Sequence, residues 1–258
     1  MSNDATGGFA AGMLVHTRDG LKPIQNIKVG DYVLSKPETG NGESTYKRVI
    51  HTLELQNQEV WYLEYIAMGK TSKYAAQPGV EVLITTPTHL FRVLGTQSNT
   101  DAALCDYYDQ PIWKSVEQLG EPESEEQVGN YEVVLLNNGD LAIISATESI
   151  KKTPTSGLGW HQAQYRGEPW EGDGHYVYFE VDKVRADITF KAQSHYNDDG
   201  LNALGDYENY LTTVYNLEIE DCHTYFVGEM GIWVHTTDCG ANEVGDTKHL
   251  DSEIEGSS

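Results

Sequence analysis

The sequence predicts an all-β protein. Its periodic segments are short and rich in Val, Ile, Tyr, Leu and Thr, residue types that fit a pleated, half-buried surface. Gly, Asn and Asp separate these segments, as turns between strands require. Only residues 115–120, SVEQLG, have the pattern of a helical turn, and the absence of a fixed-period repeat disfavours propellers and solenoids.

The predicted strands follow one another along most of the chain. They lie at residues 30–35, 48–56, 59–66, 81–86, 131–149, 175–184 and 212–221. Within 131–149 the dipeptide Asn138-Gly139 separates two apolar runs, and both of these residue types accept the positive φ angles of a tight turn. This segment is therefore expected to form a β-hairpin.

Composition divides the chain into one domain with a short segment on each side. Residues 8–236 contain the predicted strands, but residues 151–212 carry many glycines, aromatic residues and acids and few clean strands. We interpret 151–212 as an insertion between core strands. Residues 1–7 are an upstream flank, and residues 237–258 are polar, acidic and without periodicity, so we expect a linker or tail there.

The net charge of −23 limits the partners of the chain. Such a charge repels phosphate backbones and anionic lipid, so nucleic acid and membrane surfaces are not expected partners. No apolar run approaches the length of about 20 residues that a spanning helix requires, and MSNDATGG at the start lacks the features of an export signal. We therefore expect a soluble chain without an export signal of its own. We also expect the chain to be a monomer.

The three cysteines are Cys105, Cys222 and Cys239, and their spacing fits neither a disulfide framework nor a zinc knuckle. Cys222 is expected to be a small core residue. Zn²⁺ could bind histidines together with Cys239, since imidazole and thiolate are its preferred ligands, but the histidines form no ligand pattern. We expect no cofactor. The cysteines do not distinguish an oxidising from a reducing compartment.

Polar residues at strand ends are the candidates for a functional site. Thr86 and His89 form a T-x-x-H pattern after the strand at 81–86, and Pro87 between them makes a turn. The hydroxyl and the imidazole could face a common point, or they could be an ordinary turn residue and a structural histidine. His223 and His235 come from two later β-like runs, and Thr236 and Thr237 follow the second of them.

Five motifs, taken in order, resemble the Hint (Hedgehog/intein) superfamily, in particular intein-like domains of bacterial secreted and polymorphic-toxin proteins. They are GFAAGMLVHTRDGLKPIQNIKVGDYVLS at 8–35, ITTPTHLFRV at 84–93, IWKSVEQLG at 112–120, VYNLEIEDCHTYFVG at 214–228 and GIWVHT at 231–236. The resemblance covers residues 8–236 apart from the insertion. It implies a flattened horseshoe of bent strands with pseudo-twofold symmetry, whose two chain ends meet in one cleft.

The activity that this resemblance implies is cleavage of the domain's own junctions, by splicing or by simple autoproteolysis. At the upstream junction such domains begin with a cysteine that attacks the preceding carbonyl. Phe9, Gly12 and Val15 match the motif, but Gly8 occupies the position of the nucleophile, so no acyl shift can occur there. By the same resemblance, Thr86 and His89 would polarise the bond before residue 8 and protonate its departing nitrogen.

The resemblance also matches His223 to the histidine of the penultimate motif, and it gives His235 a role at the downstream junction. His235 would donate a hydrogen bond to the carbonyl of residue 236. Many relatives have an acid where Asn216 stands, which removes a base from that position. Relatives also have an asparagine that cyclises where Thr236 stands; a threonine cannot form that ring, while Thr237 supplies a hydroxyl of the kind that splicing relatives use as second nucleophile.

Three hypotheses follow from these observations. The first is a processing-arrested precursor, engineered or naturally changed at Gly8 and Thr236, whose substrate is its own flanking segments in cis. The second is a Hint fold that serves as a non-catalytic spacer or binding module within a larger secreted or toxin protein. The third is an unrelated all-β binding protein with structural histidines.

Overall fold

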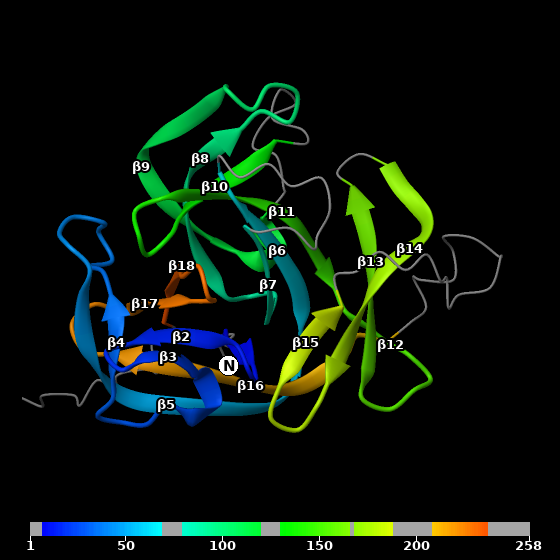
Figure 1. Cartoon of the computed structure of the whole chain (residues 1–258), viewed down its shortest axis with the longest axis horizontal. Coiled ribbons are helices and arrows are strands. Elements are labelled where there is room, and N and C mark those ends of the chain that lie inside the picture. The colour runs from blue at the N-terminus through cyan, green and yellow to red at the C-terminus, as the bar shows by residue number, and fades with distance from the viewer. Residues whose placement is uncertain (1–6, 69–78, 120–129, 166–167, 188–207, 237–258) are drawn as a thin grey trace, which may run out of the picture.

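The computed structural model describes residues 7–68, 79–119, 130–165, 168–187 and 208–236. Within these residues the chain forms β-strands and two short 3-10 turns, η1 (Ile24–Asn26) and η2 (Val116–Gln118). The predicted all-β class is confirmed, and η2 confirms the helical turn predicted at 115–120 (Figure 1). The described part of the chain contains no helix long and apolar enough to cross a membrane.

The larger of two sheets contains fourteen of the strands formed by the described residues. They are β1 (Phe9–Ala10), β2 (Leu14–Thr17), β3 (Gly20–Pro23), β4 (Tyr32–Ser35), β5 (Thr45–Glu59), β6 (Trp61–Ala67), β7 (Val80–Thr85), β8 (Leu90–Gln97), β9 (Cys105–Ser115), β10 (Tyr131–Leu135), β11 (Leu141–Ser149), β16 (Leu211–Ile219), β17 (Thr224–Val227) and β18 (Ile232–His235). The order of neighbours is β10-β11-β6-β7-β1-β16-β5-β4-β2-β17-β18-β8-β9, with β3 paired to β2. Because β10 also pairs with β8, this large sheet closes on itself.

Burial in the strands follows the side-chain alternation of a sheet. In β2 and β4 every second residue is buried, whereas all four residues of β17 and the first three of β18 are buried. The hairpin predicted at 131–149 is confirmed as β10 and β11, with Leu135 opposite Leu141. Only Gly139 of its turn takes a positive φ, +86°, so the positive angle predicted for Asn138 is wrong.

A second, four-stranded sheet lies between β11 and β16 in the chain. Its strands are β12 (Lys151–Lys152), β13 (Leu158–Tyr165), β14 (Glu168–Phe179) and β15 (Val184–Asp187), in that order. The expectation of few clean strands in this region is therefore wrong for residues 151–187. Figure 1 shows the second sheet beside the larger one, and the Val184 N–H donates to the Ala11 carbonyl at 2.8 Å.

Buried aromatic and imidazole rings join the two sheets. His161 of β13 lies opposite His175 of β14, and both side chains are buried. Tyr62 of β6 stacks on His161, with ring centroids 3.9 Å apart and planes inclined by 10°. This contact couples the position of the second sheet to β6.

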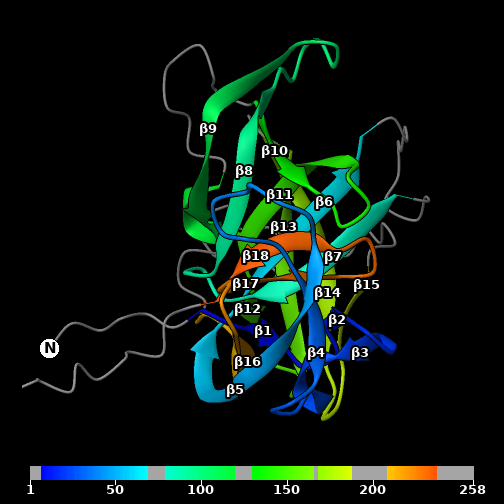
Figure 2. The same cartoon turned by 90° about the vertical axis from the view of Figure 1, so that its left-hand side faces the viewer.

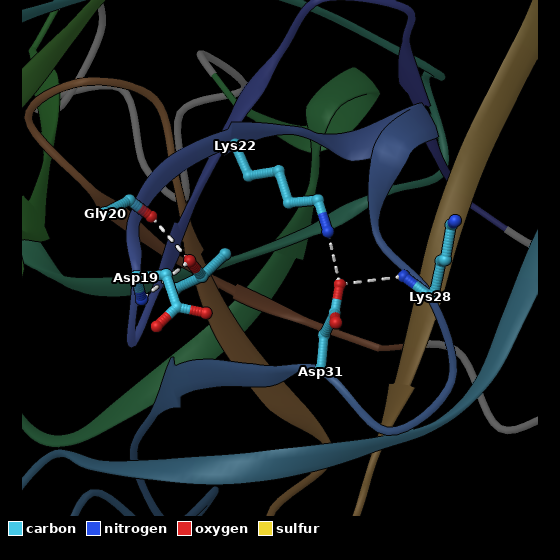
Figure 3. A network of polar contacts seen from close by, with 6 residues as sticks. Asp19, Gly20, Lys22, Lys28 and Asp31 are labelled. Atoms are coloured by element: carbon cyan, nitrogen blue, oxygen red, sulfur yellow. Dashed lines mark hydrogen bonds and ion pairs between the residues drawn. The ribbon is translucent and has the colours of Figure 1, made fainter.

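An ion pair holds the turn that precedes β4. Lys22 of β3 donates to a carboxylate oxygen of Asp31, which also accepts the Lys28 N–H at 3.0 Å (Figure 3). The Lys22 hydrogen bond is the main cause that lowers the pKa of Asp31 below its usual value. Both side chains are about one-third exposed, so this contact stabilises the fold only modestly.

Strand pairing brings distant parts of the chain to one place (Figures 1 and 2). Phe9 of β1 pairs with Thr85 of β7 on one side and with Tyr215 of β16 on the other. The β17–β18 hairpin pairs with β8 through the partners Phe91 and Val234. The pairing of β1 with β7 and β16 thereby fixes the start of β1 and the end of β7, and the pairing of β18 with β8 fixes the end of β18.

Candidate active site

The peptide bond between Gly7 and Gly8 is held by hydrogen bonds on both sides. The Gly8 N–H donates to the Thr86 Oγ1 at 3.0 Å, and the Gly7 carbonyl accepts from Asn216 Nδ2 at 2.9 Å. Thr86 and Asn216 are 3% and 1% exposed, so this bond is removed from water. This bond thus lies between Thr86, which the resemblance assigns to the upstream junction, and Asn216, which it assigns to neither junction.

Backbone pairing fixes residue 8 in this position. The Gly8 carbonyl accepts the Thr86 N–H and the Thr85 hydroxyl, both at 2.9 Å. A β-carbon built on Gly8 would lie 2.9 Å from a methyl of Val214 and 3.0 Å from the Tyr215 carbonyl oxygen. A side chain at residue 8 therefore needs both Val214 and the Tyr215 carbonyl to shift.

His89 lies against the same peptide bond. It is fully buried, and its ring centroid is 4.3 Å from that of Phe9. Neither ring nitrogen has a hydrogen-bond partner in the described part of the chain. Burial, with a smaller effect from the charge of His235, lowers the pKa of His89 to about 3, so its imidazole is neutral at pH 7.

His223 and Thr236 are joined by their backbones near the end of β18. The Thr236 N–H donates to the His223 carbonyl at 2.7 Å, beside the paired residues Thr224 and His235. His223 precedes β17 in a turn and has φ +52°, rather than lying within a strand. Thr236 is fully buried, and its hydroxyl has no hydrogen-bond partner within the described residues.

The contacts of His235 differ from those predicted. Its Nε2 lies 3.0 Å from a carboxylate oxygen of Glu38, and its ring packs edge-on against Trp113 at 4.9 Å. The hydrogen bonds of the described residues do not include one from His235 to the Thr236 carbonyl, and its Nδ1 is buried without a partner. That predicted donation requires a different position of the ring or of the carbonyl.

The residues around the Gly7–Gly8 peptide bond lie next to those near the end of β18. The charge of His235 is one of the causes that lower the pKa of His89, because β8 and β18 are paired next to these residues. Tyr225 of β17 pairs with Val234 of β18, and its ring centroid lies 6.5 Å from that of His89 while its hydroxyl donates to Asn216. Of the predicted site residues, Gly8, Thr86, His89 and Asn216 meet directly, His223, His235 and Thr236 lie beside them, and Thr237 is outside the described residues.

Sequence reasoning missed three residues of this site. Gly7 was taken as a flank, Tyr225 has the pattern of a core aromatic residue in a buried strand, and Glu38 lies in the turn after β4. Only the fold gives each of them its partner. Within the described ranges no three His, Cys, Asp or Glu side chains gather closely enough to hold a metal ion. The prediction that Cys222 is buried is confirmed.

A separate cavity of about 380 Å³ lies between β7 and the turn that joins β14 to β15. Its lining includes Val82, Ile84 and Lys183. None of the predicted site residues lines it, so it belongs to the junction of the two sheets.

Comparison with known proteins gives similarity in structure only. No family model and no curated protein matches the sequence. The solution structure of a bacterial intein-like domain from Clostridium thermocellum is similar, with 20% identity, 89% of this chain and 98% of that chain covered, and a TM-score of 0.44. A DnaB intein from Synechocystis has 11% identity, coverage of 90% and 99%, and a TM-score of 0.42. The gp41-1 intein has 14% identity, coverage of 90% and 100%, and a TM-score of 0.41. The solved structures similar to this chain thus include inteins and an intein-like domain.

Proposed function

We propose that this chain is a Hint-type self-processing domain that is arrested at both of its junctions. The observation that carries the proposal is the Gly7–Gly8 peptide bond, buried with Thr86 on its nitrogen, Asn216 on its oxygen and His89 beside it. A stretch that served only as a linker would have no reason to bury a polar peptide among three polar side chains. Its substrate is the chain's own flanking segments, cleaved in cis by a monomer.

The upstream reaction requires a nucleophile at residue 8. A cysteine thiol there attacks the Gly7 carbonyl carbon; a C–S bond forms, the C–N bond to residue 8 breaks, and the thiol proton goes to the departing nitrogen. Because the thiol and the carbonyl belong to neighbouring residues, the attack is intramolecular. Gly8 has no side chain, so the reaction stops before this step.

The downstream reaction requires an amide nitrogen at residue 236. An asparagine there attacks its own carbonyl carbon and closes a succinimide, and the amine of residue 237 leaves. Thr236 has a hydroxyl in place of the amide, in a buried position where that hydroxyl has no partner within the described residues. The position therefore holds a polar group but lacks the atom that cyclisation needs.

Restoring each nucleophile tests the proposal. Gly8→Cys, alone and with Val214→Ala to make room for the new side chain, is expected to break between Gly7 and residue 8 when thiol is added. Gly8→Ala is the matched control, because it adds the same β-carbon without a nucleophile. Thr236→Asn is expected to release the segment after residue 236. A folded Gly8→Cys chain that keeps its full mass would overturn the proposal, and a folded Thr236→Asn chain that keeps its full mass would overturn its downstream half.

A non-catalytic Hint spacer or binding module is the second candidate. The packing of Val214 and the Tyr215 carbonyl against Gly8 favours it, since a site that has lost its nucleophile can close over the empty position. This candidate predicts that Gly8→Cys with Val214→Ala folds and remains intact. With either candidate, we propose that the domain is part of a larger secreted or toxin protein. The sequence of the parent gene across both junctions tests this.

A further inference from the structure

We infer that Asn216 is the hydrogen-bond donor that activates the Gly7 carbonyl, and that Tyr225 is the residue that positions it. The inference rests on the proposed function, because it assigns roles within the upstream reaction. Asn216 touches the reacting carbonyl and is therefore a catalytic residue. Tyr225 acts only through Asn216.

The orientation of the Asn216 amide follows from its neighbours. The Leu217 N–H donates to Asn216 Oδ1 at 2.8 Å, and the Tyr225 hydroxyl donates to the same oxygen at 3.0 Å. A backbone N–H can only donate and a carbonyl can only accept, so Oδ1 must face Leu217 and Nδ2 must face Gly7. The 2.9 Å contact from Nδ2 to the Gly7 carbonyl is thereby fixed as a donation to that oxygen.

Tyr225 is suited to hold this orientation. Its side chain is fully buried, and burial raises the pKa of its hydroxyl well above the usual value. The hydroxyl therefore keeps its proton and stays a donor throughout the pH range of a folded protein. Tyr225 of β17, Asn216 of β16 and the Gly7 carbonyl form one line of hydrogen bonds, in which each bond polarises the next.

The chemistry of acyl transfer gives this line its function. When a nucleophile attacks the Gly7 carbonyl carbon, negative charge develops on the carbonyl oxygen. The Asn216 Nδ2–H already points at that oxygen in a site closed to water, so its bond strengthens as the charge grows. An ionised carboxylate in place of the amide would instead face the oxygen with like charge. An asparagine at this position therefore fits a donor role, whereas it would be useless as a base.

A purely structural role for the same contacts must be separated from this one. Asn216 could simply anchor the chain end to β16, in which case its replacement would change stability and leave the reaction rate of folded molecules unaltered. Two measurements distinguish the roles, and the first needs no cleavage.

The first measurement detects the donation in the unaltered chain. In protein labelled with ¹⁵N-asparagine and ¹³C′-glycine, we expect a scalar coupling across the hydrogen bond between Asn216 Nδ2 and the Gly7 carbonyl carbon. Tyr225→Phe should weaken this coupling, whereas Tyr210→Phe, which changes a tyrosine stacked on Phe179, should not. A folded chain without the coupling would overturn the inference.

The second measurement is the rate of thiol-induced cleavage at residue 7 in the Gly8→Cys background. We expect Asn216→Ala to slow cleavage about 100-fold, the loss typical of a missing oxyanion donor. Tyr225→Phe should slow it about tenfold, as expected for one neutral hydrogen bond. Rates are compared well below the melting temperature of every variant, so that loss of stability does not contribute.

Asn216→Asp supplies the signature that a structural role would not produce. The introduced carboxyl group can donate to the Gly7 carbonyl when it is protonated and cannot when it is ionised. The cleavage rate of this variant, relative to the Asn216 parent, should therefore rise as the pH falls through the pKa of the introduced carboxyl. Parental rates for Asn216→Ala and Asn216→Asp at every pH would overturn the inference. If Gly8→Cys itself stays intact, the proposed function fails, and the coupling alone then decides whether Asn216 donates to Gly7.

Discussion

Gly7 lies directly against His89: a β-carbon on Gly7 would be 2.6 Å from the imidazole Nδ1 and 2.7 Å from the His89 Cα. The second distance involves backbone, which cannot yield as the end of a side chain can. The residue before the proposed upstream junction is therefore restricted to glycine by the turn that carries His89.

This restriction predicts the effect of Gly7→Ala. The added methyl should push the Gly7 carbonyl away from Asn216 and lower cleavage in the Gly8→Cys background by about tenfold or more, roughly the loss of one well-placed hydrogen bond. The assay is thiol-induced cleavage followed by intact mass. Cleavage at the parental rate in Gly7→Ala would show that this contact does not limit the junction.

The buried imidazole of His89 predicts a loss of stability in acid. Its pKa is about 3 in the folded chain and about 6.5 unfolded, so the unfolded state binds more protons as the pH falls. The free energy of unfolding is therefore unaffected by this group above pH 6.5, and it decreases progressively as the pH falls from there toward pH 3. At pH 5 the loss is about 2 kcal/mol.

Replacement of His89 by a residue that does not titrate tests that assignment. Between about pH 7.5 and pH 5, the unfolding free energy of His89→Gln should fall about 2 kcal/mol less than that of the parent, as measured with denaturant. His161 also has its pKa lowered well below the usual value by burial, so part of the acid loss remains in this variant. Equal losses in parent and His89→Gln would contradict the burial of an uncharged His89.

The stack of Tyr62 on His161 predicts a large cost for its removal. Tyr62 is 1% exposed, and Tyr62→Ala would leave a cavity between β6 and the second sheet. We expect a loss of about 3–5 kcal/mol in the free energy of unfolding, typical for truncation of a buried aromatic residue. Tyr46→Ala on β5, at a tyrosine that is 44% exposed, is the control and should cost much less. Similar losses in both variants would mean that the stack does not join the sheets.

At the downstream junction, His235 is predicted to be required for release. In the Thr236→Asn background, His235→Gln should slow release of the segment after residue 236 by about 100-fold, the effect of a lost donor to the reacting carbonyl. His51→Gln, at an exposed histidine of β5, is the control. Release that persists in His235→Gln would assign the role to another group.

Glu38 gives the same junction a second prediction. Its carboxylate lies 3.0 Å from His235 Nε2, and we propose that this contact keeps the ring from donating to the Thr236 carbonyl. Glu38→Gln in the Thr236→Asn background should therefore change the rate of release while upstream cleavage in the Gly8→Cys background stays the same. An unchanged rate of release would show that the His235 ring moves freely between the two positions.

Most core strands could be predicted from sequence because their side chains alternate or form buried runs that local pattern reveals. The strand β13 and the first part of β14 could not, because their glycines and aromatic residues obscure the alternation, and stacking of His161 on Tyr62 of a distant strand stabilises them. Likewise, Asn138 was expected to share the turn geometry of Gly139, but the actual turn requires a positive φ from the glycine alone.

For the site, sequence reasoning named Thr86, His89 and Asn216, which the fold brings together, but it did not give their partners. The partner of Asn216 is the carbonyl of Gly7, and a backbone atom has no sequence signal. The role of Tyr225 depends on one hydroxyl that reaches across from β17, which a buried aromatic strand pattern does not reveal.

The intact mass of purified Gly8→Cys protein, with Val214→Ala and after incubation with thiol, tests the central claim most directly. The account predicts two fragments separated between Gly7 and residue 8, and no break in the unaltered chain or in Gly8→Ala. A folded Gly8→Cys chain of full mass would contradict it.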